Sequence, residues 1–127
     1  MGKKYLIDAN VIIDYYGKRL PLKGATFIES IVTPFISVIT EMELLGWYRI
    51  SNEEKEKLQS FVNDVTIIQI ERGVVQKTIE LRQSHKIKLP DAIIAATALA
   101  NELYLISHNS ADFKNINGLH VIDPWTL

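Results

Sequence analysis

Residues 4–16 read KYLIDANVIIDYY, and this stretch decides the fold. Its first part is a short run of strand-forming residues, its second part carries apolar side chains at helical spacing, and Asp8 stands between them. A strand that passes into a helix through one acidic residue is typical of α/β proteins, whose ligands bind at the carboxyl ends of parallel strands. We therefore expect a strand over residues 4–7, a helix over residues 10–17, and Asp8 at the ligand-binding edge of a sheet.

The rest of the chain repeats this alternation of short apolar strands and longer helical patterns. Further strands are expected at residues 34–38, 65–70, 103–106 and 119–122, and helices at 24–31, 40–48, 51–61, 71–84, 89–101 and 110–113. The pattern predicts an α/β fold with a mostly parallel central sheet of about five strands flanked by helices. The length of 127 residues suits a single domain over residues 1–127.

The composition excludes several classes of site and location. Because there is no cysteine, disulfides, zinc–thiolate sites and thiol nucleophiles are excluded. No apolar stretch approaches the roughly 18–20 residues that span a bilayer, and the apolar run at the N-terminus is too short for an export signal. We expect a cytoplasmic protein that does not bind membranes. The net charge of −1 argues against binding nucleic acid by bulk electrostatics, so RNA binding would need a local basic rim, a metal ion or a partner chain.

Four acidic residues fall where a parallel sheet would bring them together. Asp8 and Asp112 follow expected strands, whereas Glu43 and Asp91 lie near the starts of helices that follow or precede strands. Carboxylates that converge in this way repel one another and stay ionised when a cation lies among them. Oxygen ligands select Mg²⁺ or Mn²⁺, ions that activate water and stabilise the leaving oxygen in phosphodiester hydrolysis. The four positions together predict a carboxylate metal site.

Each acid also has a purely structural interpretation. Asp8 could cap the helix that follows it, and residues 40–43 read T-x-x-E, a capping box that would place the Glu43 carboxylate on the amide of the first residue. Asp91 at a helix start complements the helix dipole, and Asp112 could cap a short turn. The two interpretations can hold together, because an acid at a helix start also lies beside the end of a strand.

Four segments of the chain together resemble the motifs of the PIN domain family. They are the first strand with Asp8-Ala-Asn10, Ser37-Val-Ile-Thr40 with Glu43, Leu89-Pro-Asp91 with its Ala-rich helix, and Ser107-His-Asn109 with Asp112. Their order and spacing match from Tyr5 to Pro124, and the length matches the single-domain VapC-type toxins. The resemblance implies a three-layer, flap-endonuclease-like α/β fold.

The same resemblance implies a function and a set of site residues. It implies a metal-dependent endoribonuclease with an RNA substrate, acting as the toxin of a VapBC-type toxin–antitoxin pair, and it implies a homodimer and a cognate antitoxin protein. The metal-binding and catalytic acids of the family are matched by Asp8, Glu43 and Asp91, with Asp112 at a more variable fourth position. Supporting polar positions are matched by Asn10, Thr40, Ser107 and Asn109.

Other residues near the motifs are weaker candidates. Lys18, Arg19 and Lys88 could contact RNA phosphates, although such residues are most often solvated surface charges. His108 has no catalytic partner visible in the sequence, so we interpret it as a loop residue. The aromatic pair at residues 47–48 could stack on a base or line a protein interface.

Three alternative functions stay open at this point. The chain could be a non-toxin PIN nuclease in RNA processing, or a catalytically inactive PIN-like binding module, against which the intact acids argue. It could also be a phosphotransfer domain with Asp8 as nucleophile. That function is disfavoured because Asn10 stands where a second aspartate would be needed and no catalytic lysine is evident.

Overall fold

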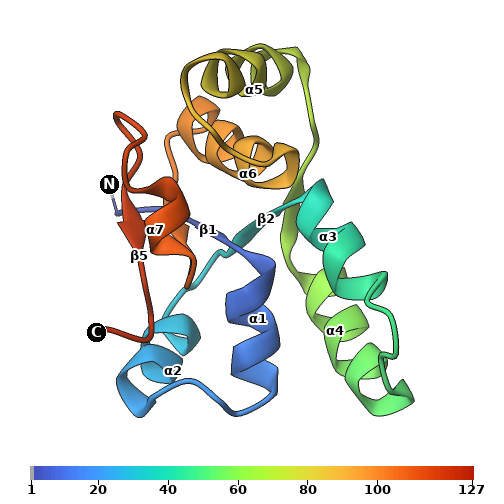
Figure 1. The fold of residues 1–127 in the computed structure, drawn as a ribbon. Helices are drawn as coiled ribbons and strands as arrows, with labels where there is room; N and C mark the ends of the chain where they lie inside the picture. The colour runs from blue at the N-terminus through green and yellow to red at the C-terminus, as the bar shows by residue number, and fades with distance from the viewer. Residues whose placement is uncertain (1) are drawn as a thin grey trace.

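Five short parallel strands form the central sheet of the computed structural model, which describes residues 2–127 (Figure 1). They are β1 (Tyr5–Ile7), β2 (Phe35–Ser37), β3 (Thr66–Ile68), β4 (Tyr104–Ile106) and β5 (Val121–Ile122). The strand order is β3-β2-β1-β4-β5, and every neighbouring pair is parallel. Strands β2 and β3 follow β1 on one side of the sheet, and β4 and β5 lie on its other side. The order of strands therefore reverses between β1 and β4, which is the switch point at which α/β proteins bind ligands.

Helices cover both faces of this sheet. Within residues 2–127 they are α1 (Ala9–Tyr16), α2 (Leu22–Glu29), α3 (Val38–Leu45), α4 (Asn52–Asp64), α5 (Arg72–Ser84), α6 (Leu89–Ala100) and α7 (Ser110–Phe113). Helices α5 and α6 lie together on one side of the sheet, and α1, α3 and α4 lie on the other (Figure 1). The predicted α/β fold of three layers, with a parallel sheet of five strands, is confirmed.

The strands divide their side chains between two cores, because successive residues in a strand point to opposite faces. Leu6 and Leu105 are fully buried against α5, α6 and α7. Ile7, Ile36 and Ile106 are buried against α1, α3 and α4. The three-residue strands are thus each held on both faces, which fixes the positions of the residues that follow them.

Helix α6 is buried on most of its surface. Ala92, Ala95, Ala96 and Ala98 have no exposed surface, and their small side chains let the helix backbone approach the sheet and α5 closely. Pro90 stands in the first turn, where its missing N–H is no loss. Tight packing therefore fixes the start of α6, and with it Asp91.

The expected elements are all present with bounds that differ by a few residues, but one predicted cap was wrong. Ser37 ends β2 in an extended conformation and is itself the N-cap of α3, with its Oγ accepting from the Ile39 N–H at 3.2 Å. The helix therefore begins at Val38, two residues before the capping box predicted at residues 40–43. Glu43 consequently lies in the second turn, where its carboxylate has no capping role.

The segment after β5 closes over the helices on one face. The Trp125 indole Nε1 donates to Asp14 Oδ2 at 3.0 Å, which joins the C-terminal segment to α1. Gly24 of α2 meets the backbone oxygen of Pro124 so closely that any side chain would collide with it. Among residues 2–127, no helix combines the length and the apolar character needed to cross a bilayer.

Candidate active site

Among the acids of the site, Asp8 is held in place by burial and hydrogen bonds. It follows β1 and is the N-cap of α1, so its Oδ1 accepts a hydrogen bond from the Ala9 N–H at 2.9 Å. Its Oδ2 accepts from Ser107 Oγ at 2.9 Å and from Asn10 Nδ2 at 3.4 Å. Only 6% of the residue is exposed. Asp8 therefore caps a helix and lies at the switch point at the same time, and its engaged, buried oxygens are poorly suited to attack as a nucleophile.

The loop after β4 supports Asp8 from the neighbouring strand. Ser107 has no exposed surface, and while its hydroxyl donates to Asp8 it also accepts from the Asn109 N–H at 3.0 Å. Asn10 links the same loop to α1, because its Oδ1 accepts from the His108 N–H at 3.2 Å. Two of the predicted supporting residues, Asn10 and Ser107, are thus hydrogen-bonded to Asp8. Asn109 takes part through its backbone.

The other three acids come from three separate helices. Glu43 is exposed in the second turn of α3, Asp91 is partly buried in the first turn of α6, and Asp112 is exposed on α7. Their helices meet at the carboxyl edge of the sheet, because α3 directly follows β2 and α7 follows β4. Four acids that are far apart in the sequence therefore lie at one edge of the fold.

The acids of the site act on one another in pairs: Asp8 and Glu43 with Asp91 and with each other, and Asp112 with Asp91. Burial raises the pKa of Asp8, the hydrogen bonds from Ser107 and Ala9 partly oppose this, and the charge of Asp91 raises it further. Desolvation raises the pKa of Glu43, and the charges of Asp8 and Asp91 add to the effect. Desolvation and then the charge of Asp112 raise the pKa of Asp91. The site thus concentrates negative charge that the protein alone compensates poorly.

The donor set fits a hard divalent cation. As positioned, no three acidic or histidine side chains among residues 2–127 stand close enough together to hold one ion. The donors are nevertheless carboxylate oxygens, which Mg²⁺ and Mn²⁺ prefer, and three of them have raised pKa values that a nearby cation would reverse. Glu43 and Asp112 are exposed, so neither side chain is fixed in its rotamer by packing.

Thr40 adds a second observation in favour of a bound group. It is fully buried in the first turn of α3, and its Oγ1 has no hydrogen-bond partner among the described residues. A buried hydroxyl without a partner costs about 1–3 kcal/mol. Thr40 and Glu43 are three residues apart and so share one side of α3, which places this hydroxyl on the side of the helix that carries the acid.

The three predicted RNA contacts fall in two places. Lys88 precedes Asp91 at the start of α6, and its charge lowers the pKa of that acid. Lys18 and Arg19 follow the opposite end of α1 from Asp8, roughly 12 Å away along an eight-residue helix. Arg19 Nε there bonds Asp14 Oδ1 at 3.2 Å. The structure does not bring Lys18 and Arg19 to the acids, and their contact with RNA stays a prediction.

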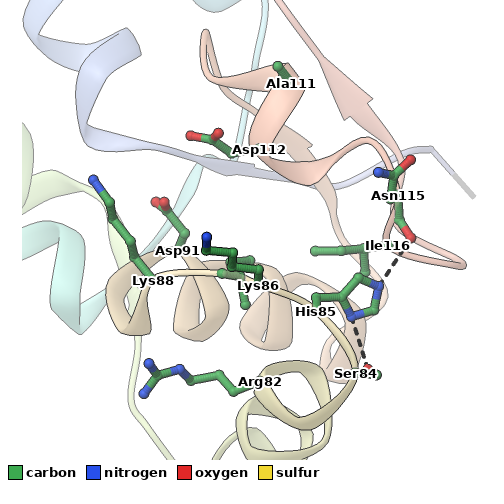
Figure 2. Close-up of a pocket in the computed structure, with 11 residues that line it drawn as sticks. Arg82, Ser84, His85, Lys86, Lys88, Asp91, Ala111, Asp112, Asn115 and Ile116 are labelled. Carbon is green, nitrogen blue, oxygen red and sulfur yellow. Dashed lines mark hydrogen bonds between the residues drawn. The ribbon is translucent and has the colours of Figure 1, made fainter.

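A pocket of about 850 Å³ opens beside Asp91 and Asp112 (Figure 2). Arg82, at the end of α5, and Asn115, after α7, also line it. Neither was singled out from the sequence, because their approach to Asp91 depends on how α5 folds back against α6. No motif encodes that arrangement.

His108 has the structural role expected of a loop residue. Its Nδ1 lies 3.1 Å from Asp123 Oδ1, and its ring lies 5.2 Å from that of Trp125. It therefore ties the loop that supports Asp8 to the C-terminal segment. The sequence offered no signal for this contact, because α7, β5 and the loop between them separate the two partners in the chain.

Comparison with known proteins defines the class of protein. The profile of the PIN domain family matches residues 5–119, so the chain belongs to the PIN domain family. The resemblance carried by the four sequence motifs is confirmed. No curated protein sequence matches the chain significantly.

Solved structures narrow the class further. A toxin–antitoxin complex from Klebsiella pneumoniae is 32% identical over 95% of this chain and 98% of its own, with a TM-score of 0.78. VapBC-1 from nontypeable Haemophilus influenzae is 25% identical over 97% and 98%, with a TM-score of 0.79. FitAcB from Neisseria gonorrhoeae, at 23% identity over 97% and 99% and a TM-score of 0.77, shares the fold. These similarities support a VapC-type PIN toxin, and with it a nuclease.

Proposed function

We propose that this protein is a metal-dependent endoribonuclease that hydrolyses RNA phosphodiester bonds as the toxin of a VapBC-type pair. The observation that carries the proposal is the buried Asp8 carboxylate, hydrogen-bonded at the sheet switch point and in electrostatic contact with Glu43 and Asp91, with Asp112 beside Asp91. The proposal includes a cytoplasmic location, a homodimer and a cognate antitoxin.

Several residues of the chain would each have a separate role in hydrolysis. When bound by the four acids, Mg²⁺ or Mn²⁺ would supply an activated water and stabilise the leaving oxygen. Asp8 gives one carboxylate whose position is set by Ser107 and Asn10. Glu43, exposed at the edge of the site, is suited to exchange a proton with the attacking water. Lys88 beside Asp91 gives a cation for the oxygens of the phosphate.

Exposed apolar side chains support the proposed protein partners. Tyr48 is 82% exposed and Met42 57% exposed on and just after α3, and Trp47 lies between them in sequence at 39%. Trp47 also lines a small apolar pocket with residues of α1 and α4. Aromatic and methionine side chains are enriched at protein interfaces, so this surface is suited to a second copy of the chain or an antitoxin.

The test is RNA cleavage by purified protein freed of any bound antitoxin. Wild type and Asp91→Asn are incubated with total cellular RNA and Mg²⁺ or Mn²⁺, and EDTA serves as the metal control. Discrete cleavage that needs both the metal and Asp91 is expected. Cleavage by Asp91→Asn at the wild-type rate would contradict the proposal.

Two further readouts separate the alternatives. If the protein neither cleaves RNA nor binds Mn²⁺ in calorimetry, the inactive binding module becomes the better account. If it cleaves RNA but its expression does not arrest growth, the chain is a PIN nuclease of RNA processing and the toxin assignment fails.

A further inference from the structure

The 850 Å³ pocket beside the acids is lined by both basic and acidic side chains. Figure 2 shows Asp112 on α7 and Asp91 on α6 at one end, with Lys88 and Lys86 beside them and Arg82 farther along on α5. Three cations and two acids therefore line one continuous space. We call it the basic pocket.

The cations of the basic pocket lack close anionic partners. Among residues 2–127, the ion pairs within 4.0 Å join Arg19 to Asp14, Lys57 to Glu53 and His108 to Asp123. Arg82, Lys86 and Lys88 take part in none of them. The lining of the pocket therefore combines three cations with two acids, a small excess of positive charge in a chain whose net charge is −1. This local excess favours an anionic ligand.

The basic pocket is held in shape by a histidine. His85 Nδ1 lies 2.9 Å from Ser84 Oγ, and its Nε2 lies 3.2 Å from the Asn115 carbonyl oxygen (Figure 2). The ring thus joins the end of α5 to the loop after α7, across the back of the cavity. Because these two segments carry the opposing walls, the pocket exists before any ligand enters, as is usual for binding sites.

We propose that the basic pocket binds the phosphodiester backbone of single-stranded RNA beside the bond that is cleaved. This proposal rests on the proposed nuclease function and specifies where its substrate lies. Arg82 and Lys86 contact phosphates of the flanking nucleotide, Lys88 contacts the phosphate nearest the acids, and Ile87 and Ile116 supply apolar surface for a sugar or base. The volume lies within the roughly 300–1,000 Å³ of small-molecule sites, which suffices for a nucleotide.

An acidic segment of a protein partner is the alternative ligand, but the acidic residues of the pocket disfavour it. Asp91 and Asp112 would repel its carboxylates at one end of the cavity. A phosphodiester strand meets the same acids at the proposed metal site, where its phosphate is a normal ligand of Mg²⁺. Mixed charge around one cavity is therefore better suited to a nucleic acid strand that passes from cations to metal-binding acids.

The test compares two charge-matched double variants. Arg82→Gln/Lys86→Gln removes two cations of the pocket, and Lys23→Gln/Lys55→Gln removes two exposed lysines on α2 and α4. Lys88 is left in place because its loss would also alter Asp91. Binding of a fluorescently labelled single-stranded RNA of mixed sequence is followed by anisotropy in EDTA, where no cleavage occurs, over a series of salt concentrations. Thermal unfolding by circular dichroism checks that both variants fold.

The pocket variant is expected to bind RNA severalfold more weakly at low salt. The slope of log affinity against log salt should fall by about 0.7 for each lost phosphate contact, about 1.4 in all. In the cleavage assay its KM should rise with little change in kcat, while the control variant behaves as wild type. Equal affinity and slope in the two variants would overturn the proposal.

The remaining outcomes separate this inference from the proposed function. If wild type cleaves RNA through Asp91 but the pocket variant matches the control, the nuclease stands and the basic pocket fails. If wild type does not cleave, but only the pocket variant loses RNA affinity, the pocket stands and the nuclease fails. If a labelled polyglutamate peptide binds through Arg82 and Lys86 and RNA does not, an acidic protein partner replaces RNA and the proposal is overturned.

Discussion

Asp8 and Asp112 belong to one proposed site but are held in opposite ways. Asp8 is buried, follows the central strand β1, and accepts hydrogen bonds on both carboxylate oxygens. Asp112 is exposed on the four-residue helix α7, and among residues 2–127 no hydrogen bond to its carboxylate is formed. One acid is fixed by the core of the fold, and the other is attached to its surface.

This difference indicates how a carboxylate site can be both rigid and adaptable. The fixed acid sets the position of a ligand relative to the sheet, whereas the exposed acid can follow a ligand as it binds or leaves. Fixing an acid has an electrostatic cost, because burial favours the neutral form and raises the pKa of Asp8. The predictions below test whether the fixed and the exposed parts of the site differ in this way.

The largest effect is expected for Asp8→Asn. The amide keeps an oxygen for the Ala9 N–H and nearly the same volume, but it loses the negative charge that a cation needs. The rate of RNA cleavage should fall by more than roughly 10- to 100-fold, which is the loss typical of residues that only orient a metal ligand. Rates are measured at saturating Mg²⁺, with Glu56→Gln on the exposed surface of α4 as a control away from the site. Wild-type activity in Asp8→Asn would show that this carboxylate is only a helix cap.

The positions of the acids could be predicted from the sequence because each one belongs to a local strand-to-helix pattern. Asp8 shows this best, since the strand, the acid and the helix are consecutive, and parallel pairing of β1 with β4 then brings Ser107 to it. The start of α3 was predicted incorrectly because two hydroxyl residues, Ser37 and Thr40, both suit an N-cap. The extended backbone at the end of β2 decided in favour of the first.

The basic pocket could not be predicted, for a different physical reason. Its walls come from α5, α6 and α7, and their spacing depends on side-chain packing between helices. The small alanines of α6 indicate close packing but do not specify which residues of α5 face Asp91. The sequence therefore identified the acids, whose positions follow from strand topology, and missed Arg82, whose position follows from tertiary packing.

The second prediction concerns the support of the fixed acid. Ser107→Ala removes the hydroxyl that donates to Asp8 Oδ2 and accepts from the Asn109 N–H. We expect cleavage to fall by roughly 10- to 100-fold, as for other residues that orient a ligand. The free energy of unfolding should fall by about 1–3 kcal/mol, because both hydrogen bonds of this buried hydroxyl are lost. Ser107→Thr, which restores a hydroxyl, should recover much of the activity, and failure to do so would indicate a packing effect instead.

A smaller effect is expected for Asp112→Asn. Because its carboxylate is exposed and not held in place, its removal should leave Asp8 and its hydrogen bonds unchanged. Cleavage should therefore fall less than in Ser107→Ala, below about tenfold, with most of the loss appearing as a need for more Mg²⁺. A metal titration of cleavage rate measures this. A loss as large as that of Asp8→Asn would remove the distinction between fixed and exposed acids.

The last prediction uses the stability of the metal-free protein. The pKa values of Asp8, Glu43 and Asp91 are raised in the folded state, so at moderately acidic pH the folded chain holds protons that the unfolded chain has released. Stability then falls as pH rises from the ordinary carboxyl range through the folded pKa values, because the folded state binds more protons. This is the reverse of the usual behaviour of a carboxylate in an ion pair.

Urea unfolding in EDTA between pH 4 and 8 measures this dependence, and the midpoint is expected to decrease as the pH rises above the ordinary carboxyl pKa of about 4. Asp8→Asn should flatten the curve and make the metal-free protein more stable than wild type at neutral pH, whereas the exposed-surface control Glu56→Gln should not. Added Mg²⁺ should reverse the wild-type trend, since cation binding favours the ionised acids. A wild-type curve that rises toward neutral pH in EDTA would mean that the buried Asp8 is well compensated within the protein, and that the fixed acid is no more strained than the exposed one.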